Sequence, residues 1–152
     1  MTKKLLLIVF VSVFVACGTQ KETEIVKEVI KSPNAPAAIG PYSQAIKVGN
    51  TLYCSGQIAI NPKTGELVVD SIEAETKQVL ENLGAVLKEA GMDFSDVVRA
   101  TVFMADMENY KRINGVYGQY FTENPPARAA VQVANLPKYV NVEISCIAVK
   151  TK

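Results

Sequence analysis

The chain has 152 residues, 49% of them hydrophobic, which is the length and composition of one globular domain with an ordinary core. Its 16 basic and 15 acidic residues give a net charge of +1, a balance that argues against a nucleic-acid partner held through its phosphates. It contains no histidine, which excludes Ser-His-Asp and Cys-His nucleophilic systems and histidine-ligated metal sites. Any acid–base chemistry therefore depends on carboxylates, tyrosine, cysteine, lysine, water or backbone groups.

The start of the chain has the features of an export signal. Two lysines precede an apolar run at 5–15, which is short for a membrane span and is followed by a small residue and Cys17. This pattern resembles a bacterial lipoprotein signal, which implies that residues 1–16 are removed and that Cys17 carries the lipid. A short buried helix is the alternative. We expect a tether at 17–25, a domain at 26–152, and an exported protein on the periplasmic or cell-surface side, anchored only by its lipid. If the signal is not processed, the protein is cytoplasmic.

The first half of the domain predicts a β-hairpin and a long helix. Residues 44–48 and 51–55 are strand-like and flank a glycine-bearing turn, and the later part of the segment 18–31 is a further candidate strand. Asp70 or Ser71 can cap the helix that follows, and Gly91 can end it. Its apolar positions recur at helical spacing: Val79, Leu80, Leu83, Val86, Leu87 and Ala90.

The second half predicts a strand, a helix and two further strands. Residues 97–104 are rich in β-branched side chains, and Asp106 can open a helix. Strand-like runs at 129–134 and 142–149 close the domain. The order of elements predicts an α+β sandwich with the helices on one side of a mixed sheet. One face of the second helix carries Tyr110, Ile113, Tyr117, Tyr120 and Phe121.

The cysteines and glycines favour a site without metal or cofactor. Cys54 and Cys146 fall in strand-like runs, where single cysteines are common packing residues, so we expect two core thiols rather than a disulfide. Three cysteines do not make a closed zinc site. The sequence also lacks the glycine-rich loops that cradle phosphates.

Arg128 is the strongest candidate for a ligand-binding residue. Two prolines at 125–126 stiffen the backbone that presents its guanidinium next to an apolar run. A planar fork held in this way suits a small carboxylate bound in bidentate fashion. Glu143, in the last strand-like run, can supply an acid or a base. The alternative is that the two residues pair with each other or stay solvated.

Five blocks of sequence follow one another along the chain: IGPYSQA at 39–45, CSGQI at 54–58, NPKTG at 61–65, Asn114 with Tyr117, and PAR at 126–128 followed by Leu136-Pro137. In this order and spacing they closely resemble the Rid family, the YjgF-like enamine and imine deaminases, over about 26–150. The resemblance implies a chorismate-mutase-like fold, assembled as a homotrimer with sites in the clefts between subunits. It also implies hydrolysis of 2-imino acids such as 2-iminopropanoate and 2-iminobutanoate, or their enamines, to 2-oxo acids and ammonia, without a cofactor.

The resemblance assigns roles to the two charged residues. Arg128 matches the arginine that binds the substrate carboxylate, and Glu143 matches the acidic residue that positions the attacking water. Two positions depart from the common pattern. Ala130, which we also count among the substrate-binding residues, stands where many members of the family carry a site cysteine. If the position acts through its backbone the change is harmless, whereas loss of a working thiol would alter activity or substrate range. Ser145 stands where the deaminases commonly have a second glutamate.

The resemblance adds four further residues to the site. Tyr42 matches a tyrosine that lines the cleft, although an ordinary turn aromatic fits as well. Asn114 matches a polar site contact, with a structural hydrogen bond as the alternative. Ser55 and Gly56 match a pair that lines the site through its backbone, and a bulge or tight bend explains Gly56 equally well.

Three other functions remain open at this point. A non-catalytic module that binds small carboxylates needs Arg128 but not Glu143, whose charge would repel an anion. A ribonuclease is disfavoured by the near-neutral charge and the absence of histidine. A redox-regulated holdase would need accessible thiols at Cys54 and Cys146.

Overall fold

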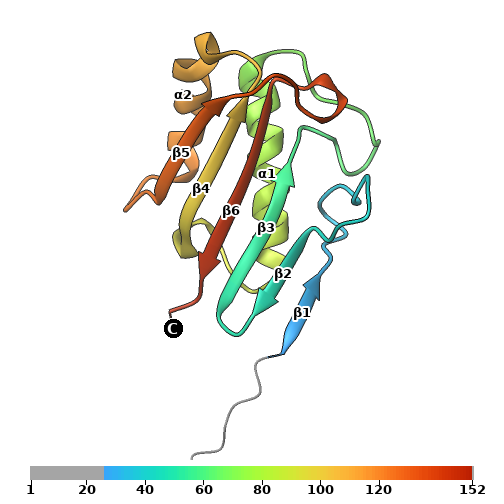
Figure 1. The fold of residues 1–152 in the computed structure, drawn as a ribbon, viewed down its shortest axis with the longest axis vertical. Helices are drawn as coiled ribbons and strands as arrows, with labels where there is room; N and C mark the ends of the chain where they lie inside the picture. Colours follow the sequence, from blue (N-terminus) through green and yellow to red (C-terminus); the bar gives the residue numbers. More distant parts are fainter. Residues whose placement is uncertain (1–25, 152) are drawn as a thin grey trace, which may run out of the picture.

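Six strands form one mixed sheet in the order β1-β2-β3-β6-β4-β5 (Figure 1). The computed structural model describes residues 26–151. Neighbouring strands are antiparallel except for β4 and β5, which run parallel. The strands are β1 (Lys27–Ile30), β2 (Ala45–Val48), β3 (Thr51–Gln57), β4 (Val97–Met104), β5 (Ala127–Gln132) and β6 (Val142–Val149).

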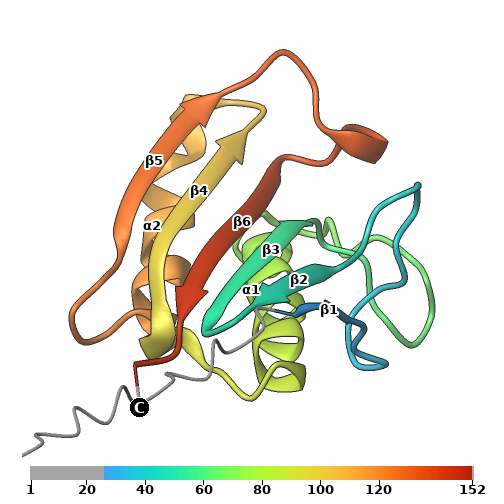
Figure 2. The same ribbon diagram turned by 60° about the horizontal axis from the view of Figure 1, so that its bottom comes forward.

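Both α-helices lie against the same face of the sheet (Figure 2). They are α1 (Ile72–Glu89) and α2 (Tyr110–Tyr120), and three short 3-10 turns complete the fold: η1 (Phe94–Asp96), η2 (Met107–Asn109) and η3 (Pro137–Tyr139). Within the described residues, no helix covers the opposite face, which we call the open face. The predicted α+β sandwich, with a mixed sheet and two helices on one face, is confirmed.

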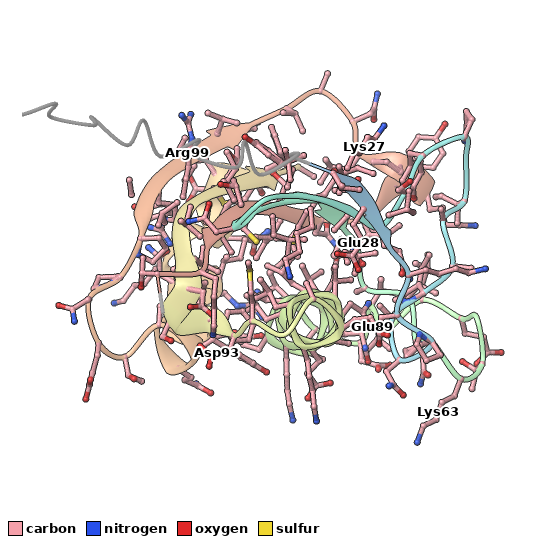
Figure 3. The ribbon with its side chains drawn as sticks, turned by 90° about the horizontal axis from the view of Figure 1, so that it is seen from below. Lys27, Glu28, Lys63, Glu89, Asp93 and Arg99 are labelled. Carbon is pink, nitrogen blue, oxygen red and sulfur yellow. The ribbon has the colours of Figure 1, made fainter. Side chains whose placement is uncertain are left out.

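The core fills the space between the sheet and the helices (Figure 3). In β6, buried and half-buried residues alternate strictly, because successive side chains of a strand point to opposite faces. Val142 and Ile144 face the helices and are fully buried, whereas Glu143 and Ser145 face the open face. Arg99 also projects from the open face (Figure 3).

The ends of α1 follow the predicted signals. The Ser71 hydroxyl caps the first turn by accepting a hydrogen bond from the Ala74 N–H at 3.1 Å. The helix ends at Glu89, and Gly91 adopts φ +73°, the left-handed conformation that glycine tolerates after a helix. The sequence alone predicts both ends of α1, because each cap depends only on neighbouring residues.

Cys54 and Cys146 lie opposite each other in β3 and β6, and both are buried free thiols. Hydrogen bonding to Cys54 and burial raise the pKa of the Cys146 thiol well above its usual range. A raised pKa keeps the thiol protonated and unreactive. The prediction of two core thiols is therefore confirmed.

Several element boundaries differ from the predictions, among them the start of β2 at Ala45 rather than 44 and the end of β5 at Gln132 rather than 134. The edge strand β5 begins at Ala127 rather than 129, because its parallel pairing with β4 starts directly after Pro126, which has no N–H to donate. β3 continues to Gln57. Asp106 caps the turn η2 by accepting from the Glu108 N–H at 2.9 Å, so that α2 begins four residues after it.

The predicted signal at 1–16, the tether at 17–25 and the lipidation of Cys17 lie outside the described residues. Among residues 26–151, no helix has both the length and the apolar character needed to cross a bilayer.

Candidate active site

The predicted site residues fall into two groups. The glutamate half consists of Tyr42, Ser55, Gly56 and Glu143. The arginine half consists of Asn114, Tyr117 and Arg128. Each group borders its own cavity.

A bulge in β3 shapes the glutamate half. Cys54 lies opposite Cys146, whereas Gln57 lies opposite Ile144, so β3 has one residue more than β6 over this stretch. The extra residue belongs to 55–56, where the irregular backbone borders the cavity. The bulge therefore forms part of the site. The two explanations given for Gly56, a bulge and a residue that lines the site, are compatible.

Gly56 makes room for the Glu143 carboxylate. A Cβ atom placed on Gly56 would overlap Oε1 of Glu143 and lie 2.9 Å from its Cγ. Gly56 has no positive φ, so its backbone does not demand glycine. The missing side chain, rather than an unusual conformation, is what the carboxylate needs.

The cavity of the glutamate half has a volume of about 290 Å³. The Tyr42 hydroxyl accepts a hydrogen bond from the Ile39 N–H at 3.2 Å, and the Ser55 hydroxyl donates to the Ser43 carbonyl at 2.7 Å. Hydrogen bonds to the segment 39–43, which precedes β2, therefore hold the side chains of Tyr42 and Ser55 in place. The lining residues are Ile39, Tyr42, Ser55, Gly56, Ile58, Pro137 and Glu143.

Glu143 is half-buried, and the loss of water around it raises the pKa of its carboxyl. Within residues 26–151, no cationic side chain forms an ion pair with it. A carboxyl that is both unpaired and raised in pKa can release and take up a proton closer to neutral pH than an exposed glutamate can. This is the property expected of an acid–base group.

Two tyrosines of α2 surround Arg128. Its guanidinium carbon lies 4.6 Å from the centre of the Tyr117 ring and 5.8 Å from that of Tyr110. Its Nη2 donates to the Tyr110 hydroxyl at 3.3 Å. The cavity beside it, of about 400 Å³, is lined by Asn114, Tyr117, Gly118, Phe121, Pro125, Pro126 and Arg128.

Sequence reasoning gave no role to Tyr110 and Tyr117. Tyr117 is buried and stacks on Phe121 with 4.3 Å between ring centres, and burial raises the pKa of its phenol to about 12. Tyr110, Asn114 and Tyr117 are spaced four and three residues apart, which places them along one face of a helix. This spacing is the signal that relates the two tyrosines to the predicted Asn114.

Ala130 lies two residues beyond Arg128 in β5 and packs against the buried core. The cavity of the arginine half does not include it in its lining. The role of Ala130 in substrate binding therefore stays a prediction.

The two halves lie on opposite faces of the sheet. Arg128 pairs with Ala100, which is fully buried beneath the helices, whereas Glu143 pairs with Phe103. Ala100 and Phe103 are three residues apart in β4, so their side chains point to opposite faces. Arg128 and Glu143 therefore do not pair within one chain, and that alternative is wrong.

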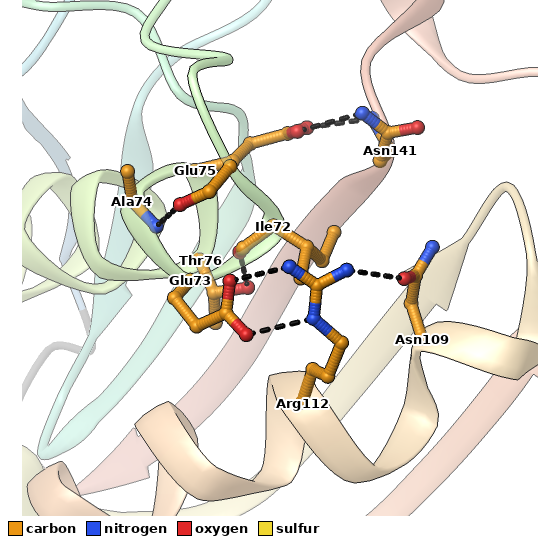
Figure 4. Close-up of polar contacts among 9 residues, drawn as sticks. Ile72, Glu73, Ala74, Glu75, Thr76, Asn109, Arg112 and Asn141 are labelled. Atoms are coloured by element: carbon orange, nitrogen blue, oxygen red, sulfur yellow. Dashed lines mark hydrogen bonds and ion pairs between the residues drawn. The ribbon is translucent and has the colours of Figure 1, made fainter.

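The first turn of α1 connects to both halves (Figure 4). Glu75 is fully buried and accepts hydrogen bonds from the Asn141 N–H at 2.6 Å, the Asn141 side-chain amide at 2.8 Å and the Val142 N–H at 3.1 Å. It thus holds the start of β6 next to Glu143. On the other side, Glu73 accepts two bonds of 2.7 Å from Arg112 of α2.

Nothing in the described part of the chain groups three or more His, Cys, Asp or Glu side chains in positions that could hold a metal ion. The polar groups of the two halves are a guanidinium, a carboxyl, phenols, an amide and the Ser55 hydroxyl. These groups can bind a carboxylate and move a proton.

The comparisons with known proteins agree with this geometry. Residues 32–150 match the family described as endoribonuclease L-PSP. The chain is 51% identical over 128 residues to a Bos taurus protein named 2-iminobutanoate/2-iminopropanoate deaminase, which covers 84% of this chain and 93% of that one. It resembles a solved structure from Thermotoga maritima with a TM-score of 0.82 and 50% identity, covering 84% of this chain and 100% of that one. E. coli TdcF, solved with bound serine, matches with a TM-score of 0.79 and 39% identity over 82% of this chain and 99% of its own. The chain therefore belongs to the endoribonuclease L-PSP family, the family of the Rid proteins.

Proposed function

We propose that the protein hydrolyses small 2-imino acids, such as 2-iminobutanoate and 2-iminopropanoate, to 2-oxo acids and ammonia. The observation that carries the proposal is Glu143: a half-buried, unpaired carboxyl with a raised pKa, for which Gly56 leaves room beside a cavity. The name of the Bos taurus relative supports the same activity at 51% identity. E. coli TdcF, whose solved structure holds serine, supports a small amino-acid-like ligand.

The chemistry needs few groups because a protonated imine is already electrophilic. Arg128 binds the substrate carboxylate and orients the C=N carbon. Glu143 takes a proton from water as its oxygen bonds to that carbon, and the carbinolamine forms. Glu143 then returns that proton to the nitrogen and accepts the proton of the new hydroxyl as the C–N bond breaks and the carbonyl forms. The released ammonia takes up this second proton and leaves as ammonium. The sum is iminium plus water giving 2-oxo acid plus ammonium.

We further propose that the working site forms between subunits of a homotrimer. Arg128 and Glu143 face opposite sides of one sheet, so a site with both takes them from two chains. The open face supports such an assembly because it exposes apolar side chains on separate strands, among them Tyr53 at 51% and Val131 at 40%. An apolar sheet face of this kind is typical of a surface that another copy covers.

The first experiment measures imine hydrolysis directly. An amino-acid oxidase or a threonine dehydratase generates imines, and semicarbazide traps those that survive. Full-length protein in mild detergent should suppress the trapped product, and Arg128→Ala should lower kcat/KM by about 30-fold or more, since breaking a desolvated charge pair costs about 2–5 kcal/mol. Glu143→Gln should reduce kcat while leaving binding of a 2-oxo acid intact. If the unaltered protein suppresses no trapping with any of several imino acids, the deaminase proposal is wrong.

The second experiment tests the shared site by mixing subunits. Arg128→Ala and Glu143→Gln chains, each nearly inactive, are unfolded together and refolded as mixed trimers. If Arg128 and Glu143 of one site come from different chains, random mixing restores up to about one quarter of the wild-type sites. A mixture no more active than its components would contradict the intersubunit site while leaving the activity itself untouched.

The alternative function is a non-catalytic module that binds small carboxylates in the same cleft. It requires the arginine half alone. Tight binding of 2-oxobutanoate without any turnover would establish it. A ribonuclease, as the family description suggests, finds no support in the near-neutral charge and the lack of histidine.

We also propose that the protein is exported and anchored by a lipid on Cys17. The support is the sequence at 1–17 alone. Metabolic labelling with a radioactive fatty acid should mark the wild-type chain and not Cys17→Ala. Equal labelling of both, or of neither, would contradict the anchor.

A further inference from the structure

Two tyrosines lie beside Arg128, and Tyr110 contacts it through a different chemical group than Tyr117 does. Tyr117 presents its ring face to the guanidinium at 4.6 Å and is buried. Tyr110 is 42% exposed, and its hydroxyl, rather than its ring, makes the short contact: 3.3 Å to Nη2 of Arg128. One tyrosine supports the guanidinium plane, and the other places a polar atom at its edge.

A phenol in this position can serve a bound carboxylate. A hydroxyl is both acceptor and donor, so it can keep its contact with Arg128 and turn its own hydrogen toward an oxygen that pairs with the same Nη2. A carboxylate has more acceptor sites than a bidentate arginine fills. The Asn114 side chain and the charge of Arg128 lower the pKa of the Tyr110 phenol, which strengthens it as a donor.

We propose that Tyr110 is a substrate-binding residue whose hydroxyl donates a hydrogen bond to the carboxylate held by Arg128. The inference rests on the proposed function and deepens it, because it makes the carboxylate site a combination of one cation and one neutral donor. The carboxylate keeps its charge throughout the reaction, so this bond is the same in substrate and transition state. Such uniform binding lowers KM and leaves kcat unchanged.

The test compares Tyr110→Phe with Tyr120→Phe in the full-length protein. Both variants remove one hydroxyl from α2, but Tyr120 packs on Phe94 and does not line the cavity beside Arg128. Tyr110→Phe should raise KM about tenfold, and the Kd of 2-oxobutanoate by calorimetry equally, with kcat within about twofold of wild type. Tyr120→Phe should change none of these. Unchanged KM and Kd in Tyr110→Phe, or tighter binding, would overturn the proposal.

A second substitution separates a donor to the ligand from a mere support for Arg128. Replacing Tyr110 with 3-fluorotyrosine makes the phenol a better donor and a poorer acceptor. Measured where the phenol is still protonated, binding of 2-oxobutanoate should tighten if the hydroxyl donates to it. Weaker binding would show that Tyr110 only accepts from Arg128, which contradicts the inference.

These readouts keep the inference apart from the proposed function. If the wild type hydrolyses no imine, yet Tyr110→Phe weakens 2-oxobutanoate binding, the proposed function fails and the carboxylate contact stands. If the wild type hydrolyses imines and Tyr110→Phe matches it in KM and Kd, the proposed function stands and the role of Tyr110 fails.

Discussion

The arginine half and the glutamate half are built in different ways. Arg128 sits against two aromatic rings of its own chain, with a hydrogen bond to one of them. The Glu143 carboxylate instead occupies space that is free because Gly56 has no side chain. It has no ion-pair partner within residues 26–151. A permanently charged group tolerates such a rigid aromatic setting, whereas a group that must gain and lose a proton needs freedom from fixed charges.

The two halves also differ in how they are anchored to the first turn of α1. The substitution with the largest predicted effect on stability tests this difference. Glu75→Ala removes the acceptor of three hydrogen bonds at the start of β6 and leaves buried N–H groups unpaired. We expect the free energy of unfolding to fall by about 2–4 kcal/mol in urea denaturation. Glu75→Gln should recover most of the loss, because its carbonyl still accepts from the backbone.

The exposed anchor of the arginine half is the matched control. Glu73→Ala breaks an ion pair whose two side chains are about half exposed to solvent, so it should lower the free energy of unfolding far less than Glu75→Ala does. If Glu73→Ala and Glu75→Ala were equally destabilising, the contrast between the two anchors would be wrong.

Gly56→Ala should affect activity more than stability. The added methyl group overlaps the Glu143 carboxylate, and the flexible glutamate side chain can move away without unfolding the sheet. We expect a loss of kcat of about 30–100-fold in the semicarbazide assay, because a displaced catalytic group loses its alignment. Gly115→Ala, in an open position on α2, should keep full activity and gain up to about 1 kcal/mol of stability.

Glu143→Gln provides a test by pH. Burial raises the pKa of Glu143 in the folded protein, so the folded state holds its proton more tightly than the unfolded state does. Stability is therefore greatest below the unfolded pKa and falls as pH rises through the folded pKa. Glu143→Gln should raise Tm near pH 7 relative to wild type, with a gain in the free energy of unfolding of less than about 1 kcal/mol for a half-exposed group. Below the unfolded pKa it should have no such effect. A gain of equal size at both pH values would contradict the assigned cause.

The smallest effect on stability is expected for Tyr117→Phe, in the arginine half. The Tyr117 hydroxyl is buried without a hydrogen-bond partner among the described residues. Tyr117→Phe removes this unpaired group and keeps the ring beneath Arg128, so stability should stay the same or rise by up to about 1 kcal/mol. A fall in stability beyond that range, measured by thermal denaturation, would mean that the hydroxyl has a partner in the assembled protein.

The sequence alone predicted the features of the fold that depend on neighbouring residues. The strand-like run at 142–149 predicted the bounds of β6, and Ser71 and Gly91 predicted the ends of α1. Glu73 and Glu75, by contrast, look alike in the sequence, as two acids in the first turn of a helix. Only the packing of α1 against β6 buries one of them and exposes the other.

The candidate site was predicted in composition but not in arrangement. Arg128 and Glu143 were identified from residue type and family resemblance. Their placement on opposite faces depends on the register of three strands, which no local pattern encodes. Tyr110 was missed because its contact with Arg128 exists only after α2 has packed beside β5.

The position of β6 has a consequence for how the chain matures. It is the last of the six strands of the sheet to be synthesised, yet it lies in the middle of the sheet, between β3 and β4. Until residue 149 has left the ribosome, the two parts of the sheet have nothing to join them, and the nascent chain cannot complete its core. A chain of this topology therefore completes its sheet only after all six strands have been made. It also means that a ribosome that stops shortly before residue 142 releases a product with two uncovered strand edges, a natural substrate for chaperones and proteases.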